Sequence, residues 1–397
     1  MSKFNLTFTR RQTLATMFSG IAATALARSP GKAFASETPF KIGLFIPLSG
    51  PAALFGPTGK ATTELAVDAV NKSGGILGRQ VQLIVADAGG PAADTARSAV
   101  KLILNDRVDA IIGSCDSSSR EALIGAIKGK VPFIFTPVFE GGVCAPNTYV
   151  IGDTPAEQIK PSLTYLMKER GAKRIFLIGN DYVWPRKLND FAVGVVQANA
   201  GEVVGNEYVP LGAANRFEDV LGRIKTAKAD LVVSTLVGSD NVNFNRTFGG
   251  FGLSHDIMRI GYLLEENTLK GIGAENSDNM FSCMSYFADL DTPENLKFKA
   301  AYEAKFNGGT APQLSNIGVD TYVGVNFLAA LAKRADGMKS AQLMAASEGL
   351  TFEGAASGQV MRSRRVDKTM YLTTCKGGKF ELVKAFDNVA AADVCPA

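Results

Sequence analysis

The feature that most constrains the fold of this chain is a pattern of strands and helices that runs along it twice. Short apolar segments alternate with amphipathic stretches, which is typical of a parallel sheet covered by helices on both faces. Each apolar segment of the first pass has a counterpart 121 to 133 residues later. The four pairs are 41–46 with 174–178, 81–85 with 206–209, 108–112 with 229–233, and 131–135 with 257–261. The repeat predicts an α/β fold of two doubly wound parallel-sheet lobes.

The segments between the predicted strands carry apolar residues at helical spacing. This holds for residues 57–72, 93–105 and 217–227, and Gly74 and Gly75 follow the first of them as a helix end would. Such apolar stripes are typical of helix faces that pack on a sheet, so we predict no site residue on them.

The candidate site lies after the predicted strands, because doubly wound sheets bind ligands beyond the carboxyl ends of their strands. If the two lobes face each other, the segments that follow their strands meet in one cleft. These segments are 47–51 with Phe55 beyond it, 113–119, 136–142, 180–184, 234–238 and 263–267.

Four polar residues in these segments could hold a solute. Asp116 and Ser117 stand at a strand-to-helix junction, where hydroxyl and backbone N–H groups bind a carbonyl or carboxylate oxygen. Helix capping alone would explain them equally well. Glu140 and Glu266 offer carboxylates that accept hydrogen bonds from an amide, a urea or an ammonium group, or that pair with a surface lysine instead.

An aromatic pair fills the turn after the strand 174–178. Dinucleotide-binding folds place glycines in that turn, whereas this chain has Tyr182 and its only tryptophan, Trp184. Because the two residues alternate, their rings point the same way in an extended segment. Packing in the core is the usual role of a tryptophan, but the polar neighbours here favour an aromatic rim around a small solute.

No pattern in the sequence predicts catalysis. The single histidine, His255, lies in a polar loop, so no Ser-His-Asp triad can form, and no phosphate-binding glycine loop is present. Cysteine and histidine do not occur at metal-ligand spacing. Glu140 and Glu266 could form a glycosidase-like pair, but any chain of this length holds such pairs. We therefore predict no catalytic residue, cofactor or metal.

Residues 1–35 have the parts of an export signal: a basic start, an apolar run of 14 residues, and a small-residue cleavage site that ends at Ala35. The run is short of the roughly 20 residues that span a bilayer. Arg10 and Arg11 resemble a twin-arginine motif, although ordinary secretion stays open. Cleavage leaves 37 basic against 38 acidic residues, a net charge of −1, so nucleic acid is not an expected partner.

The five cysteines permit disulfides in an exported protein and leave one thiol over. Cys375 and Cys395 flank a predicted terminal hairpin and form the expected pair. Cys115 and Cys144, which both follow successive buried strands, are a second, less strongly indicated pair, and Cys283 is expected to be a buried apolar residue.

Several motifs together resemble a known family. Segments 41–50, 71–79 and 113–119, after an export signal, are similar to type I periplasmic binding proteins of the leucine/isoleucine/valine class, which serve ABC importers. Segments 179–186 and 287–293 resemble the branch that binds urea and short-chain amides. Glu140-Gly141 and segment 234–238 also belong to that resemblance. It covers residues 40–385.

The resemblance implies three crossings between the lobes, at 149–153, 280–286 and 351–358. The first lobe would then hold residues 36–150 and 281–352, and the second 151–280 and 353–397. The resemblance also implies ligand contacts from the Ser117 loop, Pro137, Val138, Tyr182, Trp184 and Leu236.

The function that the resemblance implies is a periplasmic receptor that closes on a small polar solute and presents it to a membrane permease and its ATPase. The expected solute is a short-chain amide, urea or a branched-chain amino acid, and the expected receptor is a monomer. Cys115 and Phe135 stand where amide-binding relatives tend to carry tyrosine, and Glu140 stands where the amino-acid branch prefers a small hydroxyl residue. A periplasmic sensor subunit of the same fold is the alternative.

Overall fold

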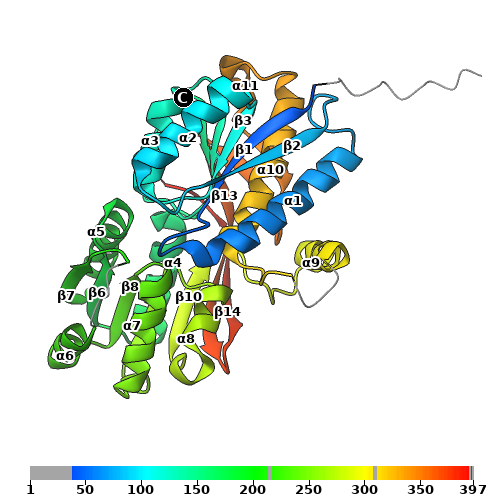
Figure 1. The fold of residues 1–397 in the computed structure, drawn as a ribbon. Helices are drawn as coiled ribbons and strands as arrows, with labels where there is room; N and C mark the ends of the chain where they lie inside the picture. The colour runs from blue at the N-terminus through cyan, green and yellow to red at the C-terminus, as the bar shows by residue number, and fades with distance from the viewer. Residues whose placement is uncertain (1–37, 213–216, 307–310, 393–394, 396–397) are drawn as a thin grey trace, which may run out of the picture.

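The structure of this chain is a computed structural model that describes residues 38–212, 217–306, 311–392 and 395. The predicted export signal lies outside the described residues. The molecule has two lobes, upper and lower in Figure 1, each built around its own sheet. This arrangement confirms the predicted α/β class with two parallel-sheet lobes.

The first lobe, the upper one in Figure 1, has a five-stranded parallel sheet in the order β2-β1-β3-β4-β5. Its strands are β1 (Phe40–Ile46), β2 (Val81–Asp87), β3 (Ala110–Gly113), β4 (Phe133–Phe135) and β5 (Thr148–Val150). The helical segments beside it are η1 (Ala53–Phe55), α1 (Gly56–Lys72), α2 (Ala92–Lys101) with the π-helical turn η2 (Leu102–Asp106), α3 (Ser117–Ile127), α9 (Pro293–Phe306), α10 (Asn316–Ala335) and α11 (Ser340–Ser347). Helices α1 and α10, far apart in sequence, lie side by side.

The second lobe orders its strands β7-β6-β8-β9-β10-β13, with β14 paired to β13. The first five are parallel, and β13 and β14 add an antiparallel hairpin. The strands are β6 (Arg174–Asn180), β7 (Glu202–Val209), β8 (Leu231–Thr235), β9 (Met258–Gly261), β10 (Met280–Met284), β13 (Arg365–Lys376) and β14 (Lys379–Val389). The helices are α4 (Pro155–Glu169), α5 (Val183–Ala198), α6 (Glu218–Thr226), α7 (Gly238–Gly250), α8 (Glu266–Ile272) and the short η3 (Ala274–Asn276).

The central strands of both sheets are buried on both faces, which is why they read as continuous apolar runs rather than alternating ones, whereas the edge strands β2 and β7 are partly exposed. Every residue of β3, β8 and β10 is buried, and in β1 only Lys41 is partly exposed. Helix covers on both sides therefore leave the strand ends as the place where side chains are free to meet a ligand.

The chain passes between the lobes after β5, after β10, and within β13. The first residues of β13 pair with β12 (Gly358–Arg362), and its later residues pair with β10 and β14. The segment predicted as the third crossing, 351–358, begins instead in β11 (Leu350–Glu353), which forms an antiparallel hairpin with β12. Leu350 and Phe352 are buried beside α10, so the apolar side chains of β11 hold this hairpin on the first lobe.

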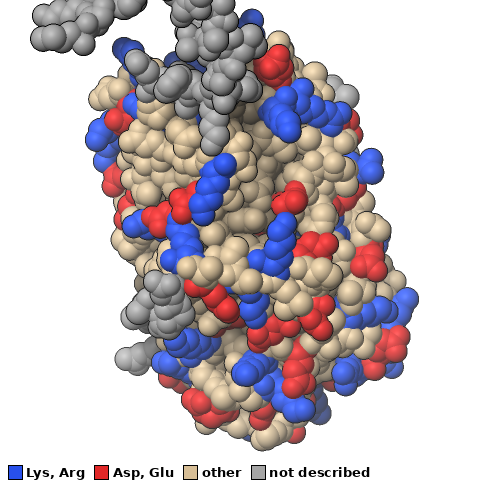
Figure 2. All heavy atoms as spheres, turned by 90° about the vertical axis from the view of Figure 1, so that its right-hand side faces the viewer, with Lys and Arg blue, Asp and Glu red and all other residues tan. Residues whose placement is uncertain are grey.

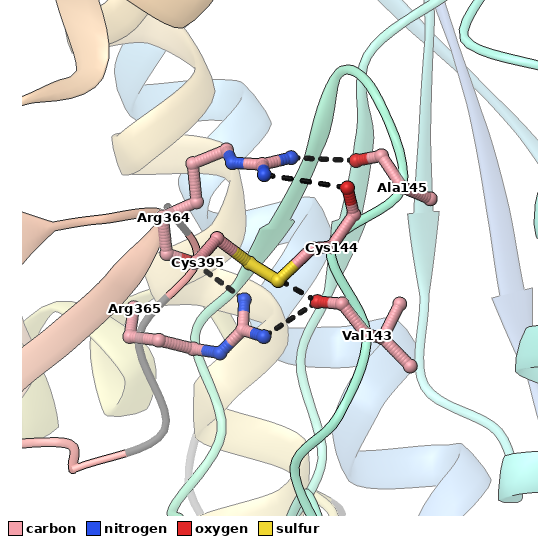
Figure 3. Close-up of a disulfide and its surroundings, with 6 residues drawn as sticks. All are labelled: Val143, Cys144, Ala145, Arg364, Arg365 and Cys395. Atoms are coloured by element: carbon pink, nitrogen blue, oxygen red, sulfur yellow. Dashed lines mark hydrogen bonds between the residues drawn. A yellow bond between two sulfur atoms is a disulfide. The ribbon is translucent and has the colours of Figure 1, made fainter. Parts of the chain in front are cut away.

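One disulfide is present among the described residues, and it joins Cys144 to Cys395 (Figure 3). The predictions of Cys375 with Cys395, and of Cys115 with Cys144, are therefore wrong. Cys375 lies opposite Phe380 near the turn of the β13–β14 hairpin, whereas β14 carries the chain to the other end of that hairpin before Cys395. Cys115, Cys283 and Cys375 are free and buried, as expected for Cys283.

The loop that carries Cys144 is also held by hydrogen bonds from the start of β13. Arg364 donates to the carbonyl oxygens of Ala145 at 2.6 Å and Cys144 at 3.3 Å, and Arg365 donates to that of Val143 at 2.6 Å (Figure 3). The disulfide thus fastens Cys395 to a first-lobe loop whose backbone also accepts hydrogen bonds from Arg364 and Arg365.

Among the described residues, none of the helices combines the length and apolarity that crossing a lipid bilayer requires. On the face shown in Figure 2, basic and acidic side chains are interspersed rather than gathered in areas of one sign.

Candidate functional site

A cavity of about 230 Å³ lies between the two lobes. The first lobe lines it with the segments that follow β1, β2, β3 and β4 and with the start of α10, and the second lobe with the segments that follow β6, β7, β8 and β9. The carboxyl ends of both sheets therefore converge on one cavity. This is the position in which a doubly wound fold binds its ligand.

Seven of the ten residues predicted for the site line this cavity. They are Phe55, Asp116, Ser117, Pro137, Val138, Tyr182 and Trp184.

The polar end of the cavity is the N-terminus of α3. Asp116 is the N-cap residue of this helix, and its Oδ1 accepts the backbone N–H of Ser119 at 2.8 Å. Ser117, the first helical residue, is buried and lines the cavity with Asp116 and Ser114. The start of a helix carries backbone N–H donors and a partial positive charge. The site thus places hydrogen-bond donors directly beside a carboxylate.

The aromatic pair of the turn after β6 forms part of the second-lobe wall. The rings of Tyr182 and Trp184 stack with their centroids 6.4 Å apart at an angle of 29°. Trp184 is buried, and its Nε1 has no hydrogen-bond partner among the described residues. The pair therefore presents flat apolar surface to the cavity, although Trp184 lies in the first turn of α5 and not in the extended segment expected from the sequence.

Tyr182 reaches toward the charges of the first lobe. Burial raises the pKa of its hydroxyl well above the ordinary value, the carboxylates of Asp116 and Glu140 raise the pKa further, and Arg120 opposes them. The first lobe contributes all three charged groups, so the pKa of this second-lobe hydroxyl depends on charges of the other lobe.

Glu140 lies outside the cavity, which corrects its prediction as a ligand contact. Its two carboxylate oxygens accept bidentate hydrogen bonds of 2.8 Å from Arg120, and both side chains are 2% exposed. The guanidinium lies over the rings of Phe135 and Phe139, 5.1 and 5.0 Å from their centroids. Burial alone would lower the pKa of Arg120, but the hydrogen bonds and charge of Glu140 raise it above the ordinary value. The carboxylate of Glu140 therefore pairs with the buried guanidinium of Arg120 and does not contact a solute in the cavity.

Leu236 and Glu266 are also absent from the lining. Leu236 packs into the apolar interior of the second lobe, and the next residue, Val237, faces the cavity instead. Glu266 is turned inward, where its Oε1 accepts the backbone N–H of Ala288 at 2.6 Å. Burial, and then the charge of Glu265, raise the pKa of Glu266 to about 8.

The remaining lining residues were not predicted individually. Pro47, Pro51, Ser114, Cys115, Val237 and Leu263 belong to strand-end segments that the sequence did indicate, and Ala52 follows one of them directly. Ala88, Gly89, Gly90 and Leu211 follow β2 and β7, the two strand ends left out of the prediction, and Ile317 comes from α10.

The lobes touch across the mouth of the cavity. The backbone N–H of Ser239 in α7 donates to the carbonyl oxygen of Pro51 at 3.3 Å. Asn267 in α8 donates from Nδ2 to Ser315 Oγ at 3.2 Å, just before α10. The structure is therefore a closed arrangement, with lobe-to-lobe hydrogen bonds beside the cavity.

Two lobes around a shared cavity at their strand ends define a solute-binding protein. Residues 39–379 match the family described as periplasmic binding protein, so this chain belongs to that family.

Three relatives illustrate the similarity. The Leu/Ile/Val-binding protein BraC3 of Rhizobium johnstonii is 27% identical over 199 residues, which cover 48% of this chain and 53% of that protein, about half its length. A solute-binding protein of an ABC transporter from Rhodopseudomonas palustris HaA2, in complex with p-hydroxybenzoic acid, aligns with a TM-score of 0.80 and 20% identity. The alignment covers 89% of this chain and 98% of the Rhodopseudomonas protein. The branched-chain amino acid transporter substrate-binding protein LivJ of Streptococcus pneumoniae, in complex with isoleucine, aligns with a TM-score of 0.74 and 21% identity. The alignment covers 88% of this chain and 99% of LivJ.

Proposed function

We propose that this chain is a periplasmic receptor of an ABC importer that closes on a branched-chain amino acid. The observation that carries the proposal is the composition of the cavity, in which one carboxylate stands beside a helix N-terminus and nearly everything else is apolar.

Each part of the cavity has a counterpart in such a ligand. The N–H groups at the start of α3 and the hydroxyl of Ser117 would donate hydrogen bonds to the α-carboxylate, and Asp116 would accept hydrogen bonds from the α-ammonium. The wall formed by Phe55, Val138 and Trp184, with its other apolar neighbours, would bury an aliphatic side chain.

Two neighbouring ligand classes fit less well. Aromatic monocarboxylates, such as the one bound to the Rhodopseudomonas protein, would match the apolar wall and the helix N-terminus. They offer no cation to Asp116, however, and an unpaired carboxylate beside a bound carboxylate costs affinity.

A short-chain amide is the second candidate, because its NH₂ group can donate to Asp116 while its carbonyl accepts from the α3 N-terminus. Urea by itself is too small to fill the cavity. A water molecule occupies roughly 30 Å³ in the liquid, and the volume of a urea molecule is only a few times that value. Most of the cavity of about 230 Å³ would stay empty around it.

The mechanism follows from the closed lobes. A solute that contacts both walls binds the closed form more tightly than the open form, and this difference in affinity is the free energy that drives closure. The importer's permease and ATPase would be the partners, and residues 1–35 the export signal, cleaved after Ala35. A periplasmic sensor subunit would close in the same way but signal to a membrane partner; the presence of permease and ATPase genes beside this one separates the two roles.

The test is calorimetric titration of protein that has been unfolded, dialysed and refolded to remove any bound solute. The panel is leucine, isoleucine, valine, benzoate, acetamide and urea. We expect the three amino acids to bind most tightly. Asp116→Asn keeps a good helix cap but removes the charge, and should weaken their binding by about 10-fold to 100-fold. Binding of benzoate or acetamide with no binding of the amino acids would contradict the proposal.

A further inference from the structure

The three chain crossings between the lobes meet at one buried ion pair. Lys368, in the crossing strand β13, lies with its Nζ 3.0 Å from Oδ1 of Asp153 in the first crossing, and both side chains are 0% exposed. Lys368 also donates to the carbonyl oxygen of Ile151. The second crossing joins through the backbone N–H of Ser285, which donates to Asp153 Oδ2 at 3.1 Å.

Two more carboxyl groups, one from each lobe, face this pair. Glu157 belongs to α4 of the second lobe, and its Oε2 accepts 2.7 Å hydrogen bonds from the backbone N–H and the hydroxyl of Thr154. Asp320 belongs to α10 of the first lobe and is 2% exposed. One oxygen of each, Glu157 Oε1 and Asp320 Oδ2, is buried with no hydrogen-bond partner among the described residues. We call Asp153, Glu157, Asp320 and Lys368 the hinge cluster.

The hinge cluster holds more acid than base. The charged groups that act on Asp320 are Asp153, Glu157 and Lys368, and the buried thiol of Cys283 lies near Asp153 and Glu157. Three ionised carboxylates around one ammonium would leave buried negative charge without a partner, which proteins avoid by protonation. The cluster therefore holds at least one proton on its carboxyl groups.

The pKa shifts agree with this charge balance. Burial, and then Asp153 and Glu157, raise the pKa of Asp320 well above its ordinary value, against the effect of Lys368. Burial raises the pKa of Glu157 to about 7, although Lys368 lowers it.

We propose that the hinge cluster takes up a proton as the lobes close, so that closure weakens as the pH rises. Asp320 moves with the first lobe and Glu157 with the second, so opening changes their distance from the crossing residues and admits water. Both changes lower the free energy of the ionised carboxylates, so their pKa values are lower in the open form than in the closed form.

The sign follows from linkage. Groups with a raised pKa in the closed form bind more protons there than in the open form, so acid favours closure. The free energy by which protonation favours closure is complete below the ordinary carboxyl pKa. It is lost as the pH rises through the raised pKa values, which are about 7 for Glu157 and well above the ordinary value for Asp320. Only the consequence for solute affinity rests on the proposed function.

The experiment measures the radius of gyration of solute-free protein by small-angle X-ray scattering between about pH 6 and about pH 9, a range that brackets such raised carboxyl pKa values. We expect the wild type to expand as the pH rises and Asp320→Asn, which keeps the shape but cannot ionise, to expand clearly less, because Glu157 is then the one remaining carboxyl group with a raised pKa in the hinge cluster. Asp109→Asn is the matched control, because Asp109 pairs with Arg79 at the amino end of β3, away from the hinge. It should expand like the wild type.

A wild type of constant radius, or an Asp320→Asn protein that expands as the wild type does, would overturn the proposal. If Asp320→Asn does not fold, Glu157→Gln provides the same comparison, since its amide can still accept the Thr154 bonds. Because no solute is added, this experiment can succeed even if the amino acids of the titration panel do not bind.

Discussion

Gly238 of the second lobe approaches Pro51 of the first so closely that a Cβ atom on Gly238 would lie 2.0 Å from the Pro51 carbonyl oxygen. The next residue, Ser239, donates its backbone N–H to that same oxygen. Gly212 makes a similar approach, with a Cβ position 2.3 Å from Pro51 Cγ. The closed form thus depends on positions without side chains at the line where the lobes meet.

Gly238→Ala should block full closure. The added methyl group meets backbone across the cleft, which cannot move aside as a flexible side chain can, so the closed form loses its close contact. We expect solute affinity to fall at least 10-fold, measured by calorimetry. Gly252→Ala is the control: it shares a positive φ, +68° against +54°, but has no atom within 4 Å. Equal losses in both variants would show that backbone strain, not the lobe contact, is responsible.

Removing Glu140 should destabilise the protein strongly although Glu140 does not line the cavity. Glu140→Ala leaves the buried Arg120 guanidinium without its bidentate partner, which costs about 3–5 kcal/mol in unfolding free energy. Glu121→Ala removes the other partner of the same arginine, but that carboxylate is 56% exposed, so a change of at most about 1 kcal/mol is expected. Urea unfolding of the two variants measures both values. Similar small losses would mean that the buried pair contributes little.

Breaking the Cys144–Cys395 disulfide should lower the unfolding free energy by about 2–4 kcal/mol, because the bond closes a long loop in the unfolded chain. Thermal unfolding with and without reductant measures the loss. The double variant Cys144→Ser/Cys395→Ser should already have the lower stability and show no further response to reductant. A response equal to that of the wild type would place the sensitive bond elsewhere.

Glu266 should make stability fall as the pH rises. Its pKa is about 8 in the folded protein and near 4 when unfolded, so the folded state holds a proton that the unfolded state releases. The resulting stability is complete below about pH 4 and is lost as the pH approaches 8. Glu266→Gln should flatten this part of the profile in denaturant unfolding at several pH values, while Glu275→Gln, an exposed residue of the same lobe, should leave it unchanged. An unaltered slope in Glu266→Gln would contradict the burial of an uncharged carboxyl group.

The sequence predicted the position of the site better than its members. Apolar runs mark buried parallel strands, and the carboxyl ends of those strands are where the cavity lies. Which residue of a strand end faces the cavity depends on the exit direction of the chain, so Leu236 was predicted where Val237 lines it. The partner of Glu140 was not predictable from spacing, because Arg120 comes from the preceding helix and meets it only in the folded lobe. The disulfide partner of Cys395 depends in the same way on where β14 ends.

The most direct measurement of the central claim, that the cavity between the lobes is the solute site, is the fluorescence of Trp184. It is the only tryptophan of the chain and lines the cavity, so a solute bound there changes its surroundings. We predict a saturable change in emission on titration with leucine, isoleucine or valine, with the same dissociation constant as calorimetry gives. Heat of binding without any change in Trp184 emission would place the bound solute outside this cavity and contradict the account.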